Sequence, residues 1–348
     1  MTGSPRQPDA LQDLRETSVR FGSDPMHIQG AGGNASVKDG AVMWIKASGT
    51  LLADAADKEI FVGTDLPAMR RALDTGDPTA DQPAAFLCPG GPDLRPSIET
   101  SLHAVFPQRV VLHTHCIHTL AHAVRKDARA CLAERLQGFN WAFVDYKKPG
   151  AHLARGVQAV LKSDTNVVVL ENHGLIVAAD NASAVADLQS QVHEALSLPA
   201  AGLKRADTVA LNALAEGSTY AAADDPHLHQ LALDPHRVAQ VTKGSLYPDH
   251  VIFCGIAVAA VRPGETLAQT VDRITQTGAP APVWLIVPGA GVLVRKDAGV
   301  SARVMMRCLA DVMARVPQDA ALNYLSIEQN LELLDWDAEK YRQKLNAC

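Results

Sequence analysis

The stretch RVVLHTHCIHTL, residues 109–120, joins a short apolar run to two histidines that one threonine separates. The apolar part predicts a buried strand over residues 109–112. Residues two apart in a strand face the same side, so His113 and His115 point together while Thr114 faces away. A lone histidine at a strand end more often satisfies backbone groups, but two in register can reach one cation. This stretch therefore predicts that a strand ends at a metal site.

A second polar interruption lies further along the chain. The segment VVVLENHGLIV, residues 167–177, breaks a β-branched run with Glu171, Asn172 and His173, followed by Gly174. A polar triplet between apolar strand segments costs desolvation free energy unless each group finds a partner. The segment therefore indicates either a function or a compensating polar network, and we expect His173 to be the third metal ligand.

Glu99, in RPSIETSLH (residues 95–103), is a fourth candidate ligand, in a helix that we expect to begin at Ser97. Both residues also have an ordinary explanation, because the helix dipole favours an acid in the first turn and serine is a common N-cap. His118 and His122, spaced i and i+4, could also hold a metal together. We favour a helix-face role for them, since the glutamate of an HExxH motif is missing.

The composition excludes several classes of partner. The formal net charge is −6 and no block of Lys and Arg occurs, so neither nucleic acid nor an anionic membrane surface is an expected partner. No apolar run reaches the ~20 residues that cross a bilayer, and the polar N-terminus is unlike a signal peptide. We expect a cytoplasmic protein that binds a small molecule. Its six cysteines lack CxxC spacing, which predicts reduced, mostly buried thiols.

Five separated motifs carry a family resemblance. In chain order they are GGNAS (32–36), ASG (47–49), PSIETSLH (96–103), HTH (113–115) and ENHG (171–174). Together they resemble the class II aldolase and adducin head family, which includes zinc-dependent fuculose and rhamnulose phosphate aldolases. The resemblance extends over residues 9–220. It implies a three-layer α/β domain with a central, mainly antiparallel sheet.

The length and the C-terminal sequence predict a second domain. A chain of 348 residues exceeds what one hydrophobic core usually supports. The composition shifts to Asp, Pro and His around residues 220–250, so we expect one domain over 1–222 and a smaller α/β domain over 223–348. Three later segments resemble the continuation of the aldolase half in bifunctional rhamnulose-phosphate aldolase/dehydrogenases: YPDHVIFCG (247–255), VPGAGVLVRKDA (287–298) and LSIEQNLELLDWDAEKYRQKL (325–345).

The resemblance implies a role for each of the four candidate ligands. His113, His115 and His173 become zinc ligands, and Glu99 becomes both a ligand and the catalytic acid/base. Zinc, or another divalent metal, stabilises the enediolate that forms when a short ketose or its phosphate is cleaved, so no Schiff-base lysine is required. An epimerase, dehydratase or decarboxylase of a sugar acid or phosphate on the same scaffold is an alternative. A non-catalytic adducin-like module is another, although it predicts lost metal ligands.

Loop residues provide the expected binding site for the rest of the substrate. Backbone N–H groups, hydroxyls and a helix N-terminus suit an anionic group. The residues concerned are Gly33, Asn34, Ser48, Gly49 and Ser97. Phosphate-binding relatives usually carry a second small hydroxyl residue next to the position of Ser97, whereas this chain has Ile98. A sugar acid or neutral sugar is therefore an alternative to a sugar phosphate.

Two further expectations rest on the resemblance. Tyr146, in VDYKKPG (144–150), is the candidate proton donor to the leaving alkoxide, against an ordinary packing role in its loop. The chain is expected to form a homotetramer in which a neighbouring subunit completes each zinc site.

Overall fold

The strand predicted from the opening stretch, β4 (Val110–Thr114), is the middle strand of a seven-stranded sheet in the order β3-β2-β1-β4-β7-β6-β5. This computed structural model describes residues 5–335. Only β5 and β6 pair in parallel, and the other neighbours are antiparallel. The strands are β1 (Asn34–Asp39), β2 (Val42–Lys46), β3 (Phe61–Asp65), β5 (Trp141–Val144), β6 (Val167–Leu170) and β7 (Gly174–Ala179). The predicted central, mainly antiparallel sheet is confirmed.

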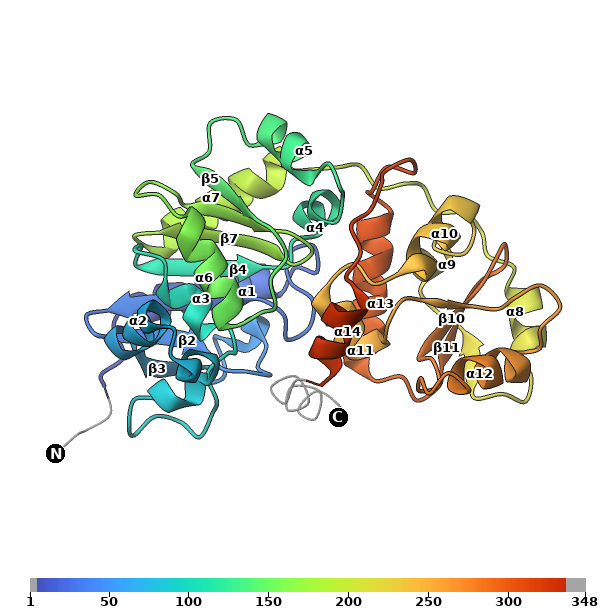
Figure 1. Cartoon of the computed structure of the whole chain (residues 1–348), viewed down its shortest axis with the longest axis horizontal. Helices are drawn as coiled ribbons and strands as arrows, with labels where there is room; N and C mark the ends of the chain where they lie inside the picture. Colours follow the sequence, from blue (N-terminus) through green and yellow to red (C-terminus); the bar gives the residue numbers. More distant parts are fainter. Residues whose placement is uncertain (1–4, 336–348) are drawn as a thin grey trace. The chain divides into compact units, whose positions relative to one another are not determined.

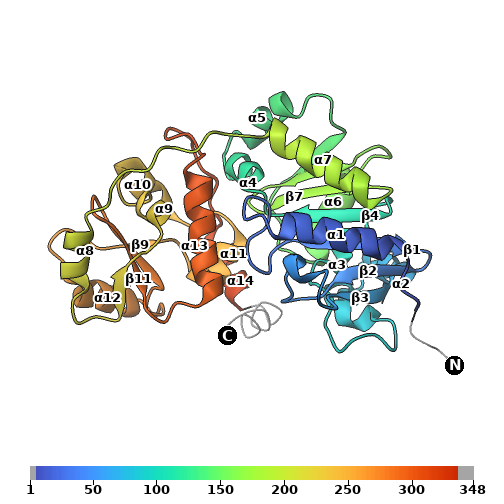
Figure 2. The same ribbon diagram turned by 180° about the vertical axis from the view of Figure 1, so that it is seen from behind.

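Helices cover both faces of this sheet, because its strands alternate apolar side chains between two cores. Val110 and Leu112 pack into one core with α1 and α7, while Val111 packs into the other with α2, α3 and α6. Figure 1 shows α3 and α6 over one face, and Figure 2 shows α1 and α7 over the other. The helices are α1 (Ala10–Gly22), α2 (Leu66–Thr75), α3 (Thr100–Ala104), α4 (Ile117–Ala123), α5 (Ala128–Arg135), α6 (Ala151–Val160) and α7 (Ala182–Ala195), with short 3-10 turns at Leu52–Asp54, Pro78–Asp81 and Pro83–Phe86. The predicted three-layer α/β domain is confirmed.

The chain divides into two compact units, and the first ends earlier than predicted. It comprises the described residues up to Ala123 together with Asp127–Ser197, and the second comprises Val124–Lys126 and the described residues from Leu198 on. The boundary expected after residue 222 falls inside the second unit. The reason is that β8 (Tyr220–Ala222) pairs with β11 (Gly291–Arg295), and Leu211 in the segment before it packs into the same core.

The second unit is the smaller α/β domain. Its mixed sheet has the order β8-β11-β10-β9. Its strands and helices share a hydrophobic core that includes Leu211, Leu267, Leu285 and Leu293. Its remaining strands are β9 (Ala259–Ala260) and β10 (Trp284–Val287), and its helices are α8 (Thr208–Ala215), α9 (Pro226–His229), α10 (Pro235–Lys243), α11 (Pro248–Cys254), α12 (Leu267–Thr275), α13 (Val300–Met313) and α14 (Ile327–Leu334). The last of the resembling segments continues to residue 345, outside the described residues. Within residues 5–335, no helix has both the length and the apolarity to cross a membrane.

Candidate metal centre

The end of β4 and the turn between β6 and β7 bring three histidines together. His113 lies in β4, His115 follows it, and His173 lies in the turn. Their ligand nitrogens all lie within 4.8 Å of one another, and the Nε2 atoms of His113 and His115 are 3.2 Å apart. All three side chains are buried. The three predicted ligands therefore converge on one point, which we call the three-histidine cluster.

The turn that carries His173 depends on a residue without a side chain. Gly174 begins β7 beside the end of β4, where Thr114 pairs with Leu175. A Cβ atom at Gly174 would lie 2.4 Å from the Thr114 carbonyl oxygen and 3.2 Å from the His113 ring. Asn172 adopts φ 53°, a left-handed conformation that asparagine tolerates better than most residues. The sequence Asn-His-Gly thus allows the His173 ring to approach β4 closely.

A backbone hydrogen bond orients the His113 ring. His113 Nδ1 lies 3.0 Å from the carbonyl oxygen of Leu175, which can only accept a hydrogen bond. The proton of a neutral ring is therefore on Nδ1, and the lone pair on Nε2 points towards His115 and His173. This arrangement is typical of metal-binding histidines, whose second nitrogen donates to a carbonyl or carboxylate.

Glu99 lies against the three-histidine cluster and is also buried. Its Oε1 is 3.3 Å from His173 Nε2, and its Oε2 is 3.6 Å from His113 Nε2. Burial opposes ionisation of this carboxyl, but the neighbouring histidines outweigh it and lower the pKa of Glu99 to about 2. Oε1 accepts no hydrogen bond from the described residues. An ionised, buried carboxylate oxygen beside three imidazoles is the donor set that a divalent cation would satisfy.

Two of the predicted loop residues support the cluster from β1. Gly33 adopts φ +66°, and a Cβ atom there would lie 2.8 Å from the His113 carbonyl oxygen. Asn34 is the strand partner of His113, and its Nδ2 donates to Glu99 Oε2 at 2.7 Å. The structure therefore places Asn34 beside the carboxylate. Its predicted role in substrate binding stays a prediction.

The other predicted loop residues lie on two adjoining segments. The Ser48 N–H donates to the Arg95 carbonyl oxygen at 2.8 Å, and the Ser97 N–H donates to the Lys46 carbonyl oxygen at 3.1 Å. Gly49 follows Ser48 directly. These backbone bonds bring the ASG motif and the start of the PSIETSLH motif side by side, as a shared binding loop requires.

The helix after Ser97 begins three residues later than predicted. Ser97 to Glu99 form a turn in which the Thr100 hydroxyl donates to the Ser97 carbonyl oxygen at 2.6 Å, and α3 begins at Thr100. Ser97 Oγ accepts the Glu99 N–H at 3.2 Å, so this hydroxyl fixes the backbone of the candidate acid/base. Ile98 is half-buried in the same turn.

The remaining predicted residue, Tyr146, and the two histidines on α4, His118 and His122, make other contacts. Tyr146 is half-buried in the loop after β5, where its N–H donates to Glu171 Oε2 at 2.9 Å. Its role as a proton donor stays a prediction. His118 and His122 are buried on α4, where His122 Nε2 lies 3.1 Å from the Leu196 carbonyl oxygen. The His118 ring packs edge-on against His193, so both histidines face the end of α7.

The sequence analysis missed a second group of potential ligands. His27, Cys116 and His193 offer ligand atoms that also lie within 4.8 Å of one another. Cys116 was expected to be a core thiol, and the two histidines are isolated in segments without a motif. The one available signal was that Cys116 directly follows the HTH motif.

Comparisons with known proteins agree with the fold and the motifs. The class II aldolase and adducin N-terminal domain family matches residues 12–198, more than half of the chain. An uncharacterized oxidoreductase from Bacillus subtilis, YuxG, is 28% identical over 183 residues, which are 49% of this chain and 26% of that protein. The chain thus spans about a quarter of that relative's length.

Two solved structures illustrate the structural likeness. The N-terminal class II aldolase domain of a Thermoplasma acidophilum protein is 26% identical, with a TM-score of 0.48, over 56% of this chain and 94% of that one. The L-fuculose-1-phosphate aldolase of Thermus thermophilus is 17% identical, with a TM-score of 0.36, over 54% of this chain and 92% of that one. On the family match over residues 12–198, this chain belongs to the class II aldolase and adducin N-terminal domain family.

Proposed function

We propose that this chain is a metal-dependent lyase of the class II aldolase type that cleaves a short ketose or its phosphate. The observation that carries the proposal is the convergence of three buried imidazoles and one ionised carboxylate at the end of β4. An adducin-like module without catalysis would not need this donor set. Buried ionisable groups cost free energy, so their presence favours a function.

The candidate ligands are His113, His115, His173 and Glu99. Three imidazoles with one carboxylate suit the four-coordinate preference of zinc, although other divalent metals accept the same atoms. When bound, such a cation supplies Lewis acidity to a carbonyl or hydroxyl oxygen of the substrate.

Glu99 is the residue that we propose to move the proton. Near the histidines its pKa is lowered to about 2, so the carboxylate is ionised and a weak base there. Burial acts in the opposite direction and would raise its pKa if the carboxylate turned away from the imidazoles. A small rotation of the side chain would thus convert it into a base able to exchange a proton with the substrate carbon.

The substrate's anionic group is proposed to bind at the adjoining segments that contain Ser48, Gly49 and Ser97. Their backbone and hydroxyl groups can hydrogen-bond a phosphate or a carboxylate. Ile98 contributes no hydroxyl to this turn, which favours a second candidate, a lyase or isomerase that acts on a sugar acid. A homotetramer is part of the proposal, and sedimentation of active enzyme only as a 37 kDa monomer would contradict it.

A metal-supplemented screen of sugar phosphates and sugar acids, scoring aldehyde release, tests the reaction. Elemental analysis tests the metal centre separately. We expect the His113→Ala/His115→Ala double variant to lose one equivalent of divalent metal and all aldehyde release. A His152→Ala variant, which changes an exposed histidine on α6, is the control and should keep both. Unchanged metal content in the double variant would refute the proposed centre.

A further inference from the structure

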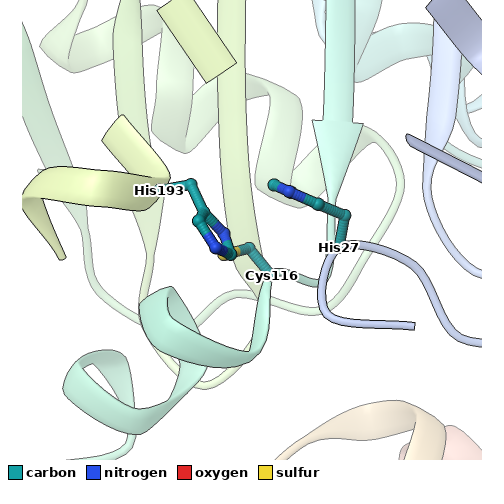
Figure 3. Close-up of side chains that lie close together, drawn as sticks. All are labelled: His27, Cys116 and His193. Atoms are coloured by element: carbon teal, nitrogen blue, oxygen red, sulfur yellow. The ribbon is translucent and has the colours of Figure 1, made fainter. Parts of the chain in front are cut away.

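His27, Cys116 and His193 form a compact group on a different side of the β4 end from the three-histidine cluster. Figure 3 shows His193 and Cys116 close together, with the His27 ring opposite them, and the centroids of the two imidazole rings are 4.3 Å apart. Val110 and Leu112 pack on the α1 and α7 side of the sheet, and Thr114 shares their face of β4. Gln189 of α7 contacts both Thr114 Oγ1 and His27 Nδ1, so the group lies on this side. We propose that His27, Cys116 and His193 bind a second, zinc-like divalent cation.

Three separate elements hold the ligands in place. The Ile117 N–H, directly after Cys116, donates to the Met26 carbonyl oxygen at 2.9 Å, which fixes the loop that carries His27. His193 lies in the last turn of α7. Ligands fixed by backbone bonds and regular elements keep a set geometry, as a metal site needs.

The distances fit one cation. Cys116 Sγ lies 3.4 Å from His193 Nδ1, close to the roughly 3.5 Å between sulfur and nitrogen ligands of one tetrahedral zinc ion. Gln189 Nε2 lies 3.0 Å from His27 Nδ1. His27 Nε2 becomes a ligand atom when the Gln189 amide is turned over, so that its oxygen accepts the Nδ1 proton. Asp24 Oδ2 lies 3.9 Å from that Nε2, so a carboxylate borders the group beside His27.

The surroundings of the group also suit a cation. The His27 side chain is buried, which favours the neutral imidazole that a cation binds. The amide of Gln189 also contacts Thr114 Oγ1 at 3.2 Å, so it is held in position to orient the His27 ring. The Asp24 side chain is 47% exposed, so the group lies close to solvent on the side of His27.

A thiolate with two imidazoles favours zinc, cobalt or another thiolate-binding transition metal over magnesium or calcium. The competing explanation is ordinary packing, since His27 stacks edge-on against Phe21 and His193 against His118. Packing leaves Cys116 as a thiol in contact with His193, whereas a metal site converts its sulfur into a thiolate ligand. The sulfur also distinguishes this group from the three-histidine cluster, which has no thiol among its ligands.

Cobalt titration of the metal-free full-length chain tests the proposal, because a cobalt–thiolate bond gives a charge-transfer band in the near ultraviolet. We expect a band that corresponds to one bound cobalt per chain and saturates by two added equivalents, because the three-histidine cluster also takes up cobalt. The band should persist in His173→Ala and be lost in Cys116→Ser. Cys131→Ser, which removes a half-buried thiol on α5, is the matched control and should keep the band. In His27→Ala, the dissociation constant for cobalt, measured from this band, should rise at least about tenfold.

Two results would overturn the proposal: no band in the wild-type chain, or a band that survives Cys116→Ser. If circular dichroism shows that Cys116→Ser is not folded, His193→Gln replaces it, since that side chain is half-buried at the end of α7. The band should then fall in His193→Gln, and an undiminished band would equally refute the site. Because the readout is a thiolate band, it is independent of aldolase activity.

Discussion

Asn34 donates a buried hydrogen bond from Nδ2 to Glu99 Oε2 at 2.7 Å, from a strand position directly opposite His113. The bond joins the GGNAS motif to the PSIETSLH motif at the carboxylate on which the proposed chemistry depends. Both side chains are buried, so removing the amide takes a hydrogen-bond donor from a buried carboxylate.

Asn34→Ala should therefore destabilise the protein through Glu99. A hydrogen bond to an ionised group contributes about 1.5–3 kcal/mol, so we expect a loss of this size in the free energy of unfolding of the metal-free chain. Denaturant unfolding of Asn34→Ala, Glu99→Gln and the double variant measures the coupling between the two residues. Strictly additive losses would show that the amide does not support the carboxylate.

Glu99→Gln should separate catalysis from folding. Glutamine keeps the side-chain volume and one ligand oxygen, so we expect the fold and most of the bound metal to persist. Turnover should fall at least about a hundredfold, the usual effect of removing a general acid/base. Steady-state kinetics with elemental analysis on the same preparation measures both quantities. An unchanged turnover would show that Glu99 is not the acid/base and serves only as a metal ligand or as an acidic residue at the start of the helix.

Stability in the second unit should depend on pH through His250. Its ring is 1% exposed, neither ring nitrogen has a hydrogen-bond partner among the described residues, and burial lowers its pKa from 6.5 to about 4. The unfolded chain therefore binds this proton first as the pH falls. The stabilising contribution is complete above about pH 6.5, is lost progressively as the pH falls from about 6.5 to about 4, and changes little below that, for a total loss of about 3 kcal/mol.

His250→Phe should remove that pH dependence while retaining a ring against Tyr247 and Trp284, whose ring centroids lie 6.0 and 6.1 Å from that of His250. Thermal unfolding of the second unit, followed at several pH values between 7 and 4, measures the pH dependence of its stability. His236→Phe, an exposed histidine on α10, is the control and should leave the wild-type slope unchanged. Equal slopes in His250→Phe and wild type would contradict the assignment.

The parts of the fold and site that could be predicted are those that a local pattern determines. The alternation around residues 109–115 sets one histidine pair on one side of β4, and the β-branched run before His173 indicates a buried strand by itself. The family motifs supplied the order of the elements between them. In this way the sheet, its helical layers and the three-histidine cluster could be expected before the structure.

Contacts between distant segments could not be read from such patterns. His27, Cys116 and His193 come from a loop, a strand end and a helix end, and nothing local to each one indicates the other two. The end of the first unit could not be predicted from the sequence, because β8 has only three residues and is recognised as a strand by its pairing with β11. The late start of α3 depends on the turn that Thr100 closes on Ser97.

Ile98→Ser tests whether the turn before α3 binds a phosphate. The residue is half-buried between Ser97, whose hydroxyl accepts the Glu99 N–H, and Glu99 itself. A serine would add one donor for an anion, and a charge-assisted hydrogen bond contributes about 1.5–3 kcal/mol. We expect the KM for sugar phosphates to fall by roughly one to two decades.

Turnover should change little, because the added hydroxyl stabilises the bound substrate and the transition state equally. Kinetics on paired substrates, one phosphorylated and one bearing a carboxylate, separate a general effect on the turn from a phosphate-specific one. Ile98→Val, which narrows the side chain without adding a donor, is the control and should keep the wild-type KM. If Ile98→Ser weakens sugar phosphates that the wild type already binds tightly, the phosphate is held by other residues. If neither form responds to phosphate, the substrate is not phosphorylated, and the sugar-acid candidate replaces the leading one.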